Sequence, residues 1–269
     1  MPGNDSQDTI PVRPDEQLDE AKLAAYLRGR LPGSELDKPP MVRQFGGGKA
    51  NLTYLLDYGA NCYVLRRPPL GPVAPSAHDM AREFKVLSRL YQAFPLAPRA
   101  FLFCQDMDIL GAPFFVMERR EGVVVRTQMP PAYTAMPQAA RRLSEALVDT
   151  LVDFHAVDYA ALGLETLGKP DGYVARQVEG WYRRWQQAKV VETPSMEAVY
   201  YWLRANLPAF PPPPPWYTTI TNWTTSCFPP PIQGSRWLYL TGICAPWAIP
   251  CWIWAGCWLT GPNPTIPLT

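Results

Sequence analysis

Charged side chains nearly disappear from this 269-residue chain after residue 210. The 59 residues from Pro211 to Thr269 contain one charged side chain, Arg236, whereas the preceding 210 residues contain the other 48. The same segment, called the tail below, holds 13 of the 32 prolines, seven of the ten tryptophans and four of the six cysteines. Soluble domains carry about 25% charged residues, so the tail is not an ordinary continuation of the fold that precedes it.

Length, net charge and cysteine spacing limit the classes of protein to which the chain can belong. A chain of this size can hold one large domain or two lobes around a real core. Its formal net charge of +1 offers no electrostatic footprint for nucleic acid or an anionic membrane. The first 30 residues are charged and lack an apolar signal-peptide core, and the six cysteines show no metal-ligand spacing. A cytoplasmic protein with reduced thiols is therefore expected.

The pattern of apolar residues predicts a small antiparallel sheet with one inserted helix, followed by a mostly helical part. A disordered leader is expected at residues 1–14. Strands are expected at residues 42–45, 52–58, 61–65, 101–104 and 113–118, and helices at 15–30, 79–94, 137–157, 172–189 and 195–206. Such an order of elements indicates an α+β fold with two lobes.

A glycine-rich turn separates the first two expected strands. It contains Gly46, Gly47 and Gly48 and is followed by Asn51. Residues without a Cβ let backbone N–H groups approach a phosphate closely. An ordinary hairpin turn would use the same glycines, so the turn alone does not decide between the two interpretations.

A strand-borne cation and a helix carboxylate follow this turn, in the order that a kinase-type phosphate site requires. Arg66 and Arg67 end a strand, and Glu83 lies in the next helix. Solvated surface charges are the alternative interpretation of these three residues. The later strand that ends with Met117 and Glu118 resembles one that leads into a hinge, where backbone groups would hold an adenine.

Three segments together resemble the aminoglycoside phosphotransferase-type kinase-like family, over roughly residues 40–210. They are Tyr63–Leu90, with its Arg-Arg-Pro-Pro-Leu-Gly-Pro run, Phe114–Gly122, and Phe154–Asp158. Within the family they are similar to the branch of bacterial phosphotransferase family proteins that is fused to acyl-CoA dehydrogenases in animals. The resemblance implies a protein-kinase-like two-lobe fold, with an N-lobe of antiparallel sheet plus helix and an incomplete helical C-lobe.

The resemblance also implies a chemistry. Family members use ATP and Mg²⁺ to transfer the γ-phosphoryl group to a hydroxyl of a small molecule, and this branch points to a hydroxyacyl thioester or similar metabolite. Arg66 would contact the phosphates, with Glu83 orienting it. The phosphate loop would be lined by Gly46, Gly47, Gly48 and Asn51, and the adenine would be bordered by Met117 and Glu118.

The catalytic half of the family's site is missing from the sequence. A catalytic loop of the type His-Asn-Asp-Tyr-Lys-Leu-Asp-Asn and a later Asp-Trp-Asp/Glu should follow, because carboxylates hold the magnesium that neutralises the developing charge. The tail contains no Asp, Glu, Lys or His. We therefore expect no catalytic residue, no metal site and no kinase turnover from this chain.

Codon degeneracy indicates that the tail is a frameshifted translation. Read one base earlier, the codons of Trp216–Phe228 permit Leu-Val-His-Asn-Asp-Tyr-Lys-Leu-Asp-Asn-Val-Met-Leu. Three positions are forced and agree: Val at Tyr217, Leu at Trp223 and Asp at Thr224. The same shift over Thr241–Leu259 permits a block that starts Asp-Trp-Asp, and its forced residues agree as well. The shift would begin in the cytosine-rich codons of the preceding proline run.

Four segments follow from these predictions: a leader and helix at 1–39, a nucleotide-binding N-lobe at 40–120, the start of a helical C-lobe at 121–210, and an aberrant, disordered tail at 211–269. A non-catalytic pseudokinase that binds a nucleotide or a partner is the alternative function. A transmembrane span at Trp237–Thr260 is disfavoured by its prolines and glycines, and a proline-rich docking tail lacks spaced PxxP motifs. His78 and His155 have no partner at a diagnostic spacing and are predicted to be structural.

Overall fold

The computed structural model describes residues 9–34, 38–46, 51–71, 78–125, 128–167, 172–207, 226–228 and 239–240. The chain divides into two compact units, one formed by Met1–Asp158 and Thr218–Thr269 and the other by Tyr159–Tyr217. Most of the tail, including nearly all of the membrane-span candidate, lies outside the described residues.

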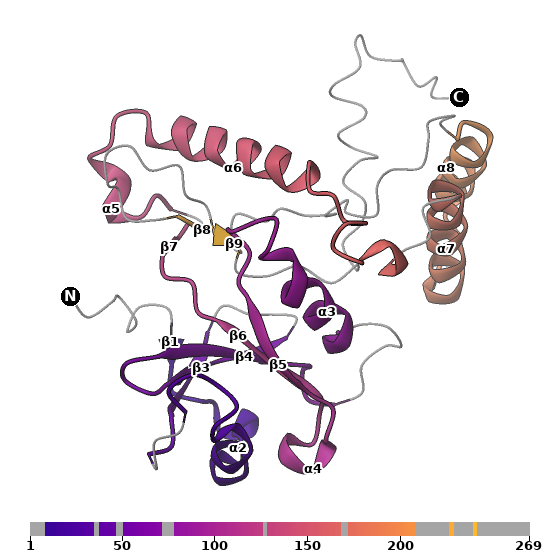
Figure 1. Cartoon of the computed structure of the whole chain (residues 1–269). Coiled ribbons are helices and arrows are strands. Elements are labelled where there is room, and N and C mark those ends of the chain that lie inside the picture. The colour runs from indigo at the N-terminus through magenta and orange to yellow at the C-terminus, as the bar shows by residue number, and fades with distance from the viewer. Residues whose placement is uncertain are drawn as a thin grey trace. The chain divides into compact units, whose positions relative to one another are not determined.

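A six-stranded antiparallel sheet forms the base of the first unit (Figure 1). The order of strands across the sheet is β1-β2-β3-β4-β6-β5. Strands β2, β3 and β4 are consecutive hairpin neighbours, whereas β6 returns between β4 and the edge strand β5. This arrangement confirms the predicted antiparallel sheet. The strands are β1 (Thr9–Ile10), β2 (Met41–Phe45), β3 (Leu52–Asp57), β4 (Cys62–Arg67), β5 (Ala100–Cys104) and β6 (Phe114–Glu118).

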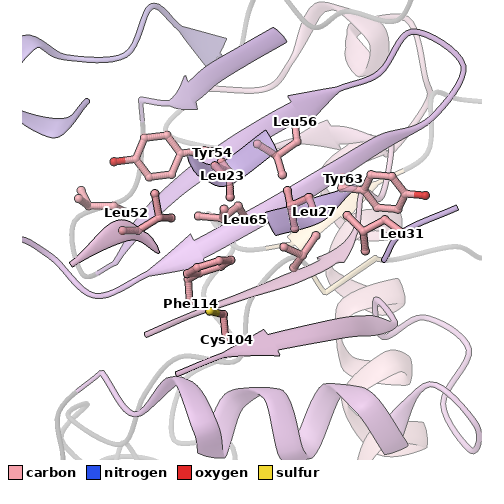
Figure 2. Close-up of a cluster of buried hydrophobic side chains, with 12 residues drawn as sticks. Leu23, Leu27, Leu31, Leu52, Tyr54, Leu56, Tyr63, Leu65, Cys104 and Phe114 are labelled. Atoms are coloured by element: carbon pink, nitrogen blue, oxygen red, sulfur yellow. The ribbon is translucent and has the colours of Figure 1, made fainter. Parts of the chain in front are cut away.

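Helices cover both faces of this sheet, which explains why its central strands are apolar at nearly every position. Figure 2 shows the first face, where leucines of helix α2 (Glu20–Leu27) and the residues after it meet β3, β4 and β6. Its fully buried members each contribute about 1.5–3 kcal/mol. They include Leu23, Leu27, Leu31, Tyr54, Leu56, Leu65 and Phe114. Helix α3 (Met80–Leu90) packs on the other face against β5 and β6.

Alternation along β4 sends two adjacent arginines to opposite faces of the sheet. Tyr63 and Leu65 belong to the cluster under α2, whereas Val64 belongs to the cluster under α3. Arg66 therefore shares the α3 face with Val64, and Arg67 shares the α2 face with Leu65. The Arg67 guanidinium donates from Nη1 to the carbonyl oxygen of Leu110 at 3.0 Å. Only Arg66 is placed to meet a carboxylate of α3.

The start of the chain contradicts one expectation. Thr9 and Ile10 form β1, which pairs antiparallel with β2, and Arg43 donates from Nε to the hydroxyl of Thr9 at 2.8 Å. The prediction of a disordered leader up to residue 14 is therefore wrong for residues 9–14. A strand of two residues has too short a pattern to read, but it covers the edge of β2 that would otherwise be open. A short 3₁₀ helix, η1 (Pro14–Glu16), follows it.

The remaining elements are mostly helical. The first unit continues with α4 (Met107–Leu110), β7 (Val123–Val124), α5 (Pro131–Thr134) and α6 (Ala139–His155). Strand β7 pairs with the short tail strand β8 (Ser226–Phe228), which pairs in turn with β9 (Tyr239–Leu240). The second unit contains η2 (Glu165–Leu167), α7 (Tyr173–Ala188) and α8 (Pro194–Ala205). None of the described helices combines the length and apolar character that a bilayer crossing requires.

Polar contacts join α7 to α8. The rings of Tyr182 and Tyr200 stack with centroids 3.6 Å apart, and the Tyr200 hydroxyl donates to the carboxylate of Glu179 at 3.0 Å. Apolar side chains on α8 stay exposed, among them Val199 and Trp202. These two are spaced three residues apart, so they share one face of the helix. This helix thus presents an apolar face that its contact with α7 does not cover.

Candidate nucleotide-binding site

The glycine-rich turn begins where β2 ends and finishes where β3 begins. Gly46 is the residue after Phe45, and a Cβ placed on it would lie 3.4 Å from Cγ2 of Ile10, an ordinary contact. Space therefore does not demand glycine at this position. Gly47 and Gly48 lie outside the described residues, so their role in a phosphate loop stays a prediction.

A buried ion pair joins β4 to α3. Nε of Arg66 lies 3.1 Å from Oε2 of Glu83, and the two side chains are 13% and 7% exposed. The interpretation of these two residues as solvated surface charges is therefore wrong. Glu83 lies in the first turn of α3, which begins at Met80 after the N-cap Asp79, and it is one of the buried residues of this helix. The strand cation and the helix carboxylate thus meet as their order in the sequence predicts.

Asn51 lies beside this pair rather than in open solvent. Asn51 is 5% exposed, and its Nδ2 donates to Oε1 of Glu83 at 3.1 Å. The two carboxylate oxygens of Glu83 are therefore divided between Arg66 and Asn51. Three of the predicted site residues thus come together at the beginning of β3, the end of β4 and the start of α3.

His78 is the residue whose place in this group the sequence did not reveal. Its Nδ1 lies 2.5 Å from Oδ1 of Asn51, and its backbone has a φ of 56°. A non-glycine residue rarely adopts this left-handed conformation. The only sequence signal is its position immediately before Asp79, the N-cap of α3, and that signal does not point to Asn51.

Burial dominates the acid–base behaviour of Glu83. Loss of solvent raises the pKa of the Glu83 carboxyl, and the opposing effects of the Arg66 charge and the Asn51 hydrogen bond do not cancel this rise. Burial thus disfavours the charged form of this carboxyl group, and Arg66 and Asn51 offset only part of that desolvation cost. Such a cost is typical of functional sites, where geometry matters more than local stability.

The two residues predicted to border an adenine lie at the end of β6. Met117 pairs with Val64 across the sheet, is 3% exposed and packs in the cluster under α3. It therefore shares a face of the sheet with Arg66. The Glu118 carboxylate is instead engaged by Arg120 at 2.9 Å and accepts from the backbone N–H of Arg99 at 3.1 Å. These contacts fix the end of the strand, and the adenine role of both residues stays a prediction.

A magnesium site does not emerge from the residues present. In the described part of the chain no three His, Cys, Asp or Glu side chains gather into a group that could hold a metal ion. The tail adds no carboxylate, since it contains neither Asp nor Glu. Magnesium prefers carboxylate and phosphate oxygens, so neither the described residues nor the tail composition offers a donor set that fits the ion.

Comparison with curated proteins gives relatives that are much longer than this chain. Acyl-CoA dehydrogenase family member 11 of Rattus norvegicus is 37% identical over 206 residues, which is 76% of this chain and 26% of that protein. Acyl-CoA dehydrogenase family member 10 of Mus musculus is 32% identical over 200 residues, covering 74% of this chain and 18% of that protein. The chain therefore matches only a minor part of either relative.

A solved structure supports the fold. A crystal structure from Ralstonia eutropha, assigned to the aminoglycoside phosphotransferases, matches with a TM-score of 0.65 and 23% identity, covering 85% of this chain and 64% of that chain. At this identity the likeness shows the fold alone. A thermostable mutant of aminoglycoside phosphotransferase APH(4)-Ia, in ternary complex with AMP-PNP and hygromycin B, matches more weakly, with a TM-score of 0.45 and 15% identity over 68% of this chain and 57% of that chain.

A family-level match covers most of the chain before the tail. Residues 41–216 match APH, the phosphotransferase enzyme family. This range contains β2 to β6, the Arg66–Glu83 pair and helices α3 to α8. The chain therefore belongs to the phosphotransferase enzyme family and has its kinase-like fold.

Proposed function

We propose that the first unit is the nucleotide-binding part of an ATP-dependent phosphotransferase that acts on a hydroxyl of a small molecule in the cytoplasm. The buried Arg66–Glu83 pair is the observation that carries the proposal. Glu83 would hold the guanidinium in place, and the terminal nitrogens of Arg66 would bind phosphate oxygens. Arginine suits this task because its planar fork can bind two oxygens at once. The backbone of the glycine-rich turn would complete the phosphate site.

We further propose that this chain, as translated, does not transfer the phosphoryl group. The residue that orients the acceptor hydroxyl and both metal ligands belong to the stretch that the tail replaces, and the tail has no carboxylate. Exposed apolar side chains on α6 and α8 support this proposal, because the remainder of a helical lobe would cover them. They are Val148, Val152, Val199 and Trp202.

The acceptor of the intact parent is proposed to be a hydroxyacyl thioester. This rests on the names of the relatives, which are acyl-CoA dehydrogenase family members. A phosphotransferase joined to an acyl-CoA dehydrogenase would act on a hydroxylated acyl thioester before or after the oxidation step.

A pseudokinase that binds nucleotide without turnover is the second candidate. It is favoured by a specific observation: the Arg66–Glu83 pair is formed, whereas the tail contains no Asp or Glu that could bind magnesium. Under this alternative, ATP binding itself would be the retained function, and it would not need magnesium.

Calorimetric titration with ATP, with and without magnesium, tests these proposals. We expect binding in both conditions with similar affinity and no release of ADP. Arg66→Ala should weaken binding by about tenfold or more, because charge-assisted hydrogen bonds to phosphate are lost. Arg66→Lys keeps the positive charge but not the planar guanidinium, so its ATP affinity should lie between those of the wild type and Arg66→Ala. Arg141→Ala, which removes an exposed arginine of α6, is the matched control and should bind as the wild type does.

Two outcomes would contradict the proposals separately. Failure of the wild-type chain to bind ATP in either condition would remove the nucleotide-binding function. Magnesium-dependent ADP release by the purified chain would instead overturn the proposed loss of catalysis.

A further inference from the structure

Asn51 directs both ends of its side-chain amide toward protein groups. Its Nδ2 donates to Glu83, and its Oδ1 contacts Nδ1 of His78. The residue is 5% exposed. A side-chain amide used in this way is committed within the protein, so it is poorly placed to bind a phosphate as the sequence suggested.

The chemistry of the partners fixes the direction of these hydrogen bonds. An ionised carboxylate can only accept, so the amide must turn its NH₂ group toward Glu83 and its oxygen toward His78. Nδ1 of His78 must then carry the proton that is donated to Asn51. The three side chains thus form one chain of donors and acceptors that runs from His78 through Asn51 to Glu83.

His78 makes this contact from a left-handed backbone conformation. Its φ of 56° lies in the left-handed region, which β-carbon-bearing residues avoid. The next residue, Asp79, caps α3 by accepting from the backbone N–H of Arg82 at 3.0 Å. Strained residues persist where the surrounding structure holds them, and they cluster at functional sites. The strain here lies at the point where α3 begins.

We propose that Asn51 and His78 form a latch, a pair of positioning residues that ties the end of the glycine-rich turn to the start of α3 and thereby sets Arg66 for phosphate binding. The latch acts through Glu83 and does not touch the nucleotide. This inference rests on the nucleotide-binding function proposed above. It differs from the interpretation of Asn51 as a residue that lines the phosphate loop.

A glycine substitution separates this role from a merely structural one. His78→Gly removes the ring but also relieves the unfavourable φ, so it should leave thermal stability unchanged or raise it. We expect it to weaken ATP binding about five- to tenfold, the value of one well-placed hydrogen bond. Gln138→Gly is the matched control, because Gln138 has the same φ of 56° at the N-cap of α6 and its side chain makes no capping bond. It should change stability in the same direction and leave ATP affinity as it is.

A double-mutant cycle distinguishes positioning from direct phosphate contact. If Asn51 acts through Glu83 and Arg66, then Asn51→Ala should weaken ATP binding in the wild-type chain but add little in the Arg66→Ala chain. Additive losses would overturn the latch and return Asn51 to the phosphate loop. Wild-type affinity in His78→Gly would overturn it as well.

If the wild type binds no ATP, the proposed nucleotide-binding function is wrong but the latch can still be tested. Amide hydrogen exchange of the chain without nucleotide provides that test. His78→Gly and Asn51→Ala should then speed amide exchange in the first turn of α3, at Met80–Phe84, and leave the end of that helix near Leu90 unchanged. Exchange at the first turn that matches the wild type would overturn the latch on its own.

Discussion

Replacing Glu83 by alanine is expected to lower the free energy of unfolding of the first unit by about 3–5 kcal/mol. The substitution leaves the Arg66 guanidinium, whose side chain is 13% exposed, without its counter-charge. It also removes the acceptor of the Asn51 amide. Removing one member of a buried pair costs far more than the pair contributes, because the remaining charge stays desolvated. Native-state hydrogen exchange of β3 and β4 amides in increasing urea measures this loss within the unit itself.

The double substitution Arg66→Met with Glu83→Leu is the control. Apolar side chains of similar volume remove both charges together, so most of the lost stability should return. ATP binding should not return, because no cation is left for the phosphates. A cost of less than about 1 kcal/mol for Glu83→Ala would show that the pair behaves as an exposed salt bridge, and the proposed site would lose its main support.

Restoring the reading frame is expected to have the largest effect on activity. Insertion of one cytosine into the codons of Pro211–Pro215 would make the following codons encode the His-Asn-Asp-Tyr-Lys-Leu-Asp-Asn block. Carboxylates for magnesium and for the acceptor hydroxyl would then be present, and a turnover on the order of 1–100 s⁻¹ is expected for a suitable acceptor. ADP release with a panel of hydroxyacyl thioesters measures it, and the 269-residue chain should show no release above background.

Alanine in place of the aspartate that the restored frame encodes at the position of Ile220 provides the control. This variant should lose turnover but keep ATP binding, because it removes the group that orients the acceptor hydroxyl. Equal turnover from the restored chain and from the chain with its present tail would show that the tail is not what prevents catalysis.

The sheet and its site could be predicted to different depths. Alternating and apolar runs indicated five strands, because strand periodicity determines which face of a sheet a residue occupies. The order of the glycine-rich turn, the strand-borne Arg66 and the helical Glu83 indicated that these two side chains would meet. The family resemblance had already assigned the phosphate role to Arg66 rather than Arg67, and the alternation along β4 places Arg66 on the α3 face. The two-residue strand at Thr9 lacked a pattern of its own and depended on the free edge of β2.

The latch was beyond prediction for a different reason. Asn51 and His78 are 27 residues apart in the sequence, and His78 has a left-handed backbone that local propensity disfavours. Tertiary contacts overrode that propensity. Sequence-based prediction is expected to fail at functional sites, because residues there can adopt conformations that their local propensity disfavours.

The nucleotide sequence from Pro211 to Phe228 tests most directly whether a phosphotransferase N-lobe has been joined to an out-of-frame tail. A frameshift predicts a cytosine at the end of the Tyr217 codon, a guanine at the end of the Thr219 codon and an adenine at the end of the Thr224 codon. Read one base earlier, these bases encode the histidine, the catalytic aspartate and the metal-binding asparagine. Any other base at the end of the Thr219 codon would exclude that aspartate and contradict the frameshift.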